Sequence, residues 1–184
     1  MKAITVKDVM VSVSEYATVS KEATLYDAVL ALEKAQKEFD RTRYRHRAIL
    51  VYDESGKIVG KVSQLDILRA LEPKYEQIGT PRSSAHNPFT QKFMKSLFHQ
   101  FNLWDKPLDA ICRKAGQKKV KEFLVSPNEG EYVEEQTSLN EAIHQLVIGH
   151  HQSLLVMRGK EITGILRLTD VFSKVSNMLK ACEP

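Results

Sequence analysis

The residues of this sequence best suited to chemistry are its histidines, its cysteines and a serine that precedes a predicted helix. His144, His150 and His151 lie close together, but no carboxylate or cysteine at ligand spacing completes a metal site. Ser63 has no recognisable histidine and aspartate relay, and the sequence contains no glycine loop of the phosphate-binding types. The sequence therefore predicts neither an enzyme nor a metal protein.

Basic side chains are the second feature that could carry chemistry. They gather in two places, Arg41, Arg43, Arg45 and Arg47, and then Arg113, Lys114, Lys118, Lys119 and Lys121. Such clusters attract phosphate groups on a nucleotide or a nucleic acid, or they form a solvated face. Because the net charge is only +4 and no recognition helix or stacking motif is present, nucleic-acid binding is disfavoured.

The composition is that of an ordinary globular protein. A chain of 184 residues can form one domain or two small ones. Its longest apolar runs are strand-sized, and its first residues do not follow the order of a secretory signal. Cys112 and Cys182 lack metal-ligand spacing, which predicts reduced thiols. We therefore expect a cytoplasmic protein with no membrane segment.

The main feature of the sequence is an internal repeat. The matched segments are residues 6–12 with 120–126, 24–29 with 138–143, 46–51 with 151–156, and 65–68 with 169–172. The first copy carries extra residues around positions 33–44. Matches of this length, all in the same order, indicate two copies of one unit.

Each copy has the pattern strand, helix, strand, strand, helix. The first helix of each copy begins with a capping box, Thr24 with Asp27 or Ser138 with Glu141, followed by apolar residues at helical spacing. The central strands are predicted at residues 48–52, 57–62, 154–157 and 161–166, and each hairpin turn contains a glycine. One such sheet cannot cover both of its faces. We therefore predict an α/β fold of two repeated β-α-β-β-α units, packed as a pseudo-two-fold pair with a helical insert between them.

The predicted divisions are residues 1–71 for the first repeat, 72–119 for the insert, and 120–184 for the second repeat with its C-terminal helix. In the insert, Asn87 before Pro88 is a predicted helix start. Apolar residues then recur at helical spacing, namely Phe93, Met94, Leu97, Phe98, Phe101 and Trp104. We expect this stripe to pack over the core or across a homodimer, or else to bind a partner. A second short helix is predicted to end near Gly116.

Both units resemble the cystathionine β-synthase (CBS) domain, a small module that occurs in tandem pairs. The resemblance is carried by Gly60-Lys61-Val62-Ser63-Gln64-Leu65-Asp66, which fits the pattern Gly-x-hydrophobic-Ser/Thr-x-x-Asp. The pattern recurs in register in the second copy, except that Arg167 replaces the Ser or Thr. Leu50 and Leu155 also depart from the family, in which many members have proline there. The resemblance covers the two repeats and leaves the insert unexplained.

The resemblance implies a ligand and a site. Tandem CBS pairs commonly bind adenosine-containing ligands (AMP, ADP, ATP or S-adenosylmethionine) in clefts between the repeats. Carried onto this chain, Asp66 and Asp170 are expected to hold ribose hydroxyls, and Ser63 to help hold phosphate. Arg167 is expected either to bind phosphate or to close its cleft. A carboxylate can accept both hydroxyls of a cis-diol, and a helix N-terminus favours an anion. Without a ligand, each Asp is simply a helix cap.

The same resemblance implies further contacts around the central strands. The phosphate is expected near His46, Arg47, His151 and Ser153, and adenine near Val11, Ile49, Val125 and Leu154.

These features favour a regulatory module in which an adenosine ligand shifts the arrangement of the repeats and signals to an unknown protein partner. The alternative is a structural adaptor that dimerises and binds a protein through the helical insert, with vestigial pockets. The resemblance also implies a homodimer.

Overall fold

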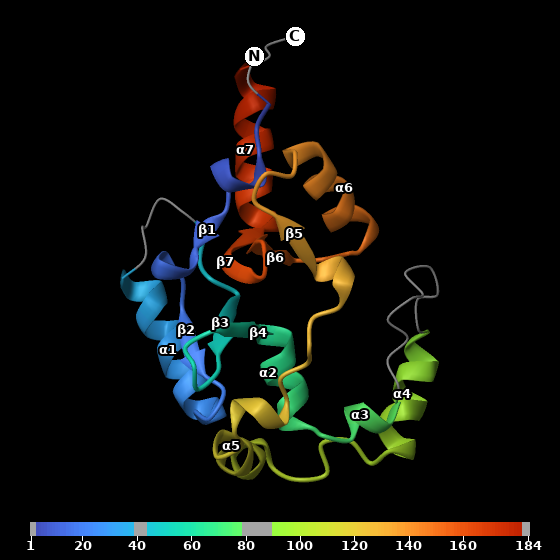
Figure 1. Cartoon of the computed structure of the whole chain (residues 1–184). Helices are drawn as coiled ribbons and strands as arrows, with labels where there is room; N and C mark the ends of the chain where they lie inside the picture. Colours follow the sequence, from blue (N-terminus) through green and yellow to red (C-terminus); the bar gives the residue numbers. More distant parts are fainter. Residues whose placement is uncertain (1–2, 39–43, 79–89, 182–184) are drawn as a thin grey trace.

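The computed structural model describes residues 3–38, 44–78 and 90–181, which form two sheets with helices packed on them (Figure 1). The first repeat contains β2 (Thr18–Ser20), α1 (Leu25–Glu38), β3 (Ala48–Tyr52), β4 (Ile58–Ser63) and α2 (Gln64–Leu71). The second contains β5 (Tyr132–Glu134), α6 (Leu139–Ile148), β6 (Ser153–Arg158), β7 (Glu161–Arg167) and α7 (Leu168–Ala181). The α/β fold class and the order β-α-β-β-α are thus confirmed in both copies.

Both repeats pair their strands in the same way. The first strand runs parallel to the second, with Val19 beside Val51 in the first repeat, and the second strand forms an antiparallel hairpin with the third. Gly56 and Gly159 lie in the two hairpin turns with positive φ, a conformation that glycine adopts readily. The predicted glycine turns are therefore confirmed.

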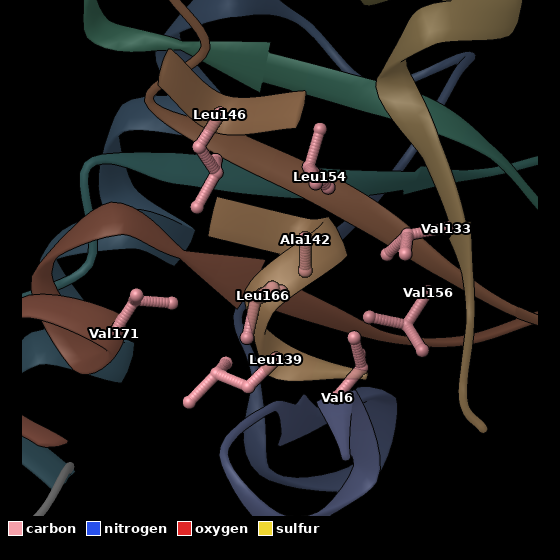
Figure 2. Packing of buried hydrophobic residues seen from close by; sticks show 9 residues of the cluster. All are labelled: Val6, Val133, Leu139, Ala142, Leu146, Leu154, Val156, Leu166 and Val171. Carbon is pink, nitrogen blue, oxygen red and sulfur yellow. The ribbon is translucent and has the colours of Figure 1, made fainter. Parts of the chain in front are cut away.

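The segment that opens the first repeat packs on the second repeat. Its 3₁₀ turn Val6–Asp8 places the fully buried Val6 side chain in the hydrophobic cluster of the second repeat, near Leu139 and Val156 (Figure 2). The Val6 N–H donates to the Thr137 carbonyl at 2.9 Å. The core of the second repeat is therefore completed by a residue from the start of the chain.

The segment that opens the second repeat packs on the first repeat in the matching way. Its 3₁₀ turn Val120–Glu122 places the fully buried Val120 in a cluster with Ala28 and Val51. The Val120 N–H donates to the Ala23 carbonyl at 2.8 Å. The repeats thus exchange their opening segments, a feature that the repeat pattern did not predict. The domain boundaries at residues 71 and 119 stay a prediction.

The exchange also adds a strand to the second sheet. β1 (Val11–Ser12) pairs antiparallel with β7, which gives the strand order β1-β7-β6-β5. At this contact Gly164 faces Ser12, and a Cβ on Gly164 would lie 2.5 Å from the Val11 carbonyl oxygen. The motif glycine of the second copy is therefore required by the close approach of β1.

A third hydrophobic cluster joins the two repeats. Its buried members are Val11, Tyr16, Leu50, Ile58, Leu155 and Ile165. Leu50 and Leu155 occupy matching positions in the two copies, and they lie together in this cluster. This arrangement agrees with the predicted pseudo-two-fold packing.

The insert contains α3 (Tyr75–Ile78), α4 (Gln91–Gln100) and α5 (Leu108–Gly116). α5 ends at Gly116 as predicted and lies against α1 and α2 (Figure 1). α4 begins after Thr90, whose hydroxyl accepts from the Phe93 N–H at 3.2 Å. The helix start predicted at Asn87 and Pro88 lies outside the described residues.

The aromatic stripe of the insert does not form one packed face. Phe93, Met94 and Phe98 are exposed, and α4 buries none of its residues, so the prediction that this part covers the core is wrong. Asn102 has positive φ and ends the helical path, so Trp104 lies outside α4. The indole N–H of Trp104 donates to the hydroxyl of Tyr75 at 3.0 Å. Packing of α4 across a homodimer stays a prediction.

We predict that Val6→Ala and Val120→Ala each lower the free energy of unfolding by about 2 kcal/mol, because each removes two buried carbons from the core of the other repeat. The control is Val125→Ala, at an exposed valine, which should cost less than about 0.5 kcal/mol. Urea denaturation measures all three. A cost for Val6→Ala no larger than that of Val125→Ala would contradict the exchanged packing.

Candidate functional site

Asp66 lies in the first turn of α2, directly after β4, and caps that helix. The Ser63 hydroxyl donates to Asp66 Oδ2 at 2.6 Å and accepts from the Asp66 N–H at 3.2 Å, while the Ser63 N–H donates to the same carboxylate oxygen at 2.8 Å. This capping box fixes both side chains at the end of α2 that favours an anion. The two residues predicted to bind ribose and phosphate therefore lie together and serve as a helix cap.

Asp66 also forms part of the wall of a cleft of about 460 Å³, which we call the Asp66 cleft. Its lining residues come from α2, from α3 and from the segment that opens the second repeat: Leu65, Asp66, Leu68, Arg69, Ala70, Tyr75, Glu76, Phe123 and Val125. The Asp66 side chain is 25% exposed, and its carboxylate is 3.8 Å from the Arg69 guanidinium. Small-molecule pockets typically measure ~300–1,000 Å³. The cleft therefore has room for a nucleoside or nucleotide.

A partly buried ion pair connects the two repeats close to Asp66. Lys61 Nζ, on β4, donates to the Ser153 carbonyl at 2.8 Å and lies 3.2 Å from Glu131 Oε2. Burial lowers the pKa of Lys61, although the charges of Glu131 and Asp66 act in the opposite direction. A cation from the first repeat thus lies against the second repeat near the Asp66 carboxylate.

His151 lies next to this ion pair. Burial lowers the pKa of its imidazole, partly offset by the Glu131 carboxylate. A Cβ on Gly130 would lie 3.9 Å from His151 Nε2, which is an ordinary van der Waals contact. His151 and Ser153 were predicted as site residues, but Ser153 contributes its carbonyl and its side chain is buried.

Sequence reasoning missed Lys61, Arg69 and Glu131. For Lys61 a signal was present, because it stands in the motif where the second copy has Ile165, which is fully buried. A charged residue in a strand position that the repeat fills with isoleucine indicates a polar role. Arg69 and Glu131 carry no comparable signal.

Asp170 lies at the matching position in the second repeat, but its carboxylate is bound by the Arg167 guanidinium. Arg167 Nε and Nη2 donate to the two carboxylate oxygens at 2.5 and 2.7 Å, and Nη1 donates to the Tyr44 carbonyl at 2.8 Å. His46 Nδ1 is 3.3 Å from the same Nη1. The structure thus brings together Arg167, Asp170 and His46, which were all predicted site residues. The hollow beside them, the Asp170 cleft, measures about 220 Å³.

Tyr16 packs against His46 and Arg167. Its ring meets that of His46 edge-on, with 4.2 Å between centroids, and Arg167 Cζ lies 6.0 Å from the Tyr16 ring centre. Burial raises the pKa of Tyr16 to about 12, with the positive charge of Arg167 acting in the opposite direction. In the repeat alignment Tyr16 corresponds to Gly130, so the second copy has no aromatic ring at the matching position.

Three of the predicted adenine contacts have side chains inside the cores. Val11, Ile49 and Leu154 are fully buried in hydrophobic clusters and line neither cleft, whereas Val125 lines the Asp66 cleft. The Arg47 side chain is exposed, and its carbonyl accepts from the backbone of α2. The apolar pattern could not distinguish a cleft wall from a core.

The second basic cluster makes structural contacts. Lys119 and Lys121 both bind the Glu22 carboxylate, with shortest N–O distances of 3.0 and 2.9 Å. These ion pairs join the exchanged segment to the first repeat. Arg41 and Arg43 of the other cluster lie outside the described residues.

In residues 3–38, 44–78 and 90–181, no group of three or more His, Cys, Asp or Glu side chains could hold a metal ion. None of the helices in these ranges is long and apolar enough to cross a membrane.

Comparison with known proteins identifies the fold. Residues 6–73 match the family model of the CBS domain, and no curated protein matches the sequence. The putative acetoin utilization protein (AcuB) from Vibrio cholerae has a TM-score of 0.60 at 20% identity, with 100% of both chains covered. CBSX2 in complex with AMP has a TM-score of 0.58 at 18% identity, covering 95% of this chain and 98% of that one. The CBS domain of the bacterial CNNM/CorC family Mg²⁺ transporter in complex with ATP has a TM-score of 0.58 at 17% identity, covering 94% and 87%.

Residues 6–73 therefore form a CBS domain, and the whole chain has the fold of a tandem CBS pair. The resemblance inferred from the Gly-to-Asp motif is confirmed.

We predict that Asp66→Ala lowers the free energy of unfolding by about 1 kcal/mol, because α2 loses half of its capping box. Asp27→Ala is a matched control, since Asp27 forms the same box with Thr24 at the start of α1, away from both clefts. Both variants should therefore shift the urea midpoint in the same direction. A stabilising effect of Asp66→Ala would show that the Asp66 carboxylate is not needed as a cap.

Proposed function

We propose that this chain is a non-catalytic regulatory module that binds an adenosine-containing ligand, namely AMP, ADP, ATP or S-adenosylmethionine, in the Asp66 cleft. CBS-domain proteins are generally regulatory modules, and two similar structures are complexes with AMP and ATP. The observation that carries the proposal is the partly exposed Asp66 carboxylate on the wall of a cleft to which both repeats contribute.

In this proposal the ribose binds Asp66 and the phosphate binds near Ser63, both at the start of α2. The Asp66 carboxylate can accept hydrogen bonds from both ribose hydroxyls, as a single carboxylate does with a cis-diol. A phosphate meets the N-terminus of α2 at Ser63, where the helix dipole favours negative charge. Arg69, on the cleft wall beside Asp66, supplies a further cation.

The second repeat supplies the remaining contacts. Phe123 and Val125 give the cleft apolar surface, which suits the face of an adenine ring. Lys61, which bridges to Glu131 and lies beside His151, offers a second cation for phosphate. A phosphate that bound Lys61 would compete with the Glu131 carboxylate for the same ammonium group.

Such a ligand would touch both repeats at once, and this is the basis of the proposed regulation. Its binding free energy depends on the distance between α2 and the 123–131 segment, so it favours the arrangement that fits best. The output is a change in the position of one repeat against the other, read by a protein partner. Homodimerisation is part of the same proposal.

We predict that calorimetric titration of the full chain with AMP, ADP, ATP and S-adenosylmethionine detects binding of at least one of them. Asp66→Ala should weaken that binding by at least about tenfold, because the ribose loses its acceptor. Asp27→Ala should bind as the wild type does, although it loses an equivalent helix cap.

The two variants separate a lost ligand contact from a general loss of stability. Equal weakening in both would assign the effect to folding. Absence of heat for all four ligands with a folded wild-type protein would refute the proposed function.

The exposed face of α4 favours one other function, that of a protein-binding adaptor. Phe93, Met94 and Phe98 lie on a helix that buries none of its residues, at the margin of the molecule (Figure 1). The same titration distinguishes the two functions, since an adaptor with vestigial pockets binds no adenosine ligand.

A further inference from the structure

Four positions around the two motif aspartates match between the copies, and two of them hold different residues. Asp66 corresponds to Asp170 and His151 to His46, whereas Ser63 corresponds to Arg167 and Gly130 to Tyr16. The acidic and histidine positions are thus retained in both copies. The two other positions hold small residues on the Asp66 side and large residues on the Asp170 side.

Beside the second cleft the large side chains form one connected group with the retained residues. We call it the Arg167 cluster, made of Tyr16, His46, Arg167 and Asp170. Arg167 holds both oxygens of Asp170 and the Tyr44 carbonyl, and it lies against His46 and the Tyr16 ring. All four members of the cluster are buried. The carboxylate that matches the proposed ribose acceptor is therefore already bound within the protein.

The accessibility of the two carboxylates differs accordingly. The Asp66 side chain is 25% exposed beside a cleft of about 460 Å³, whereas the Asp170 side chain is 9% exposed beside a hollow of about 220 Å³. The smaller volume is below the range of ~300–1,000 Å³ typical of small-molecule pockets. A ligand would also have to break a buried ion pair with two hydrogen bonds, which leaves charges without compensation.

The Arg167 cluster also makes the contact between repeats that a ligand would make. Arg167 and Asp170 belong to the second repeat, while the Tyr44 carbonyl, Tyr16 and His46 belong to the first. On this side the repeats are joined by the protein's own guanidinium group. On the Asp66 side the matching position holds the small Ser63 hydroxyl.

We propose that Arg167 is an internal occupant of the Asp170 cleft, so that this cleft is permanently closed and the chain binds a single ligand, in the Asp66 cleft. The number of ligands rests on the proposed function, whereas the closure by Arg167 does not. The sequence left two roles open for Arg167, which were to bind phosphate or to close its cleft. The geometry assigns closure.

The number of ligands is tested by titrating the full chain with AMP and, separately, with ATP. The wild type should bind a single molecule per chain, and Asp66→Ala should weaken that binding by at least about tenfold. Arg167→Ser with Tyr16→Gly gives the second cleft the residues of the first, and should add a second molecule. The reverse exchange, Ser63→Arg with Gly130→Tyr, places a guanidinium next to the Asp66 carboxylate, as Arg167 lies next to Asp170, and should abolish binding without unfolding the protein. Two molecules per wild-type chain, or undiminished binding to the folded reverse variant, would overturn the proposal.

Closure is tested without any ligand, by NMR of the full chain carrying isotope-labelled arginine. The Arg167 Nε–H should exchange with water roughly tenfold or more slowly than that of Arg158, and Arg167→Lys assigns the signal by removing it. Arg158 is a matched control, since it makes the same bidentate pair with Glu135 but its side chain is 65% exposed. Equal exchange would overturn the closure even if AMP binds, whereas slow exchange with no binding would refute only the proposed function.

Discussion

The exchange of opening segments between the repeats is the contact on which the rest of the structure depends. Val6 completes the core of the second repeat and Val120 completes that of the first, so neither core is closed by its own copy. The backbone that carries each valine continues directly into a cleft wall, as Phe123 and Val125 do beside Asp66. The position of the candidate ligand site is therefore set by hydrophobic burial at a place where no ligand is needed.

The exchange gives the two repeats matching backbone arrangements, but a few residue differences give the two aspartates different contacts. Both copies retain an aspartate in the first turn of the helix that follows their hairpin, but in one the aspartate helps cap its helix and in the other it binds Arg167. A guanidinium with several fixed donors can hold a carboxylate, a carbonyl and an aromatic face at once. The Asp170 side is thus joined by Arg167, whereas the Asp66 side is joined by Lys61 and keeps an open cleft for a ligand.

The sequence predicted the elements well because their signals are local. Capping boxes, hairpin glycines and apolar spacing placed helices α1, α2, α5 and α6 and the central strands close to their observed ends. The exchange was missed because Val6 and Val120 look alike in both copies, and a repeat pattern does not show which core each valine enters. In the site, Asp66 and Ser63 came from the motif, and Lys61 could have been found as a charged residue at a position that the second copy fills with isoleucine. Tyr16 required knowledge of which strand edges meet. The core positions of the Val11 and Ile49 side chains could not be predicted for a related reason, since apolar residues line clefts and cores alike. Their role as adenine contacts stays a prediction.

The most direct test of the account is hydrogen exchange of the backbone amides with and without saturating AMP, followed by mass spectrometry of short peptides. The account predicts slower exchange in residues 60–69 and 123–131, which face each other across the Asp66 cleft. Exchange in residues 44–46 and 167–170 should not change, because the Arg167 cluster already holds them together. Protection that appeared at residues 167–170 and not at residues 60–69 would contradict the account.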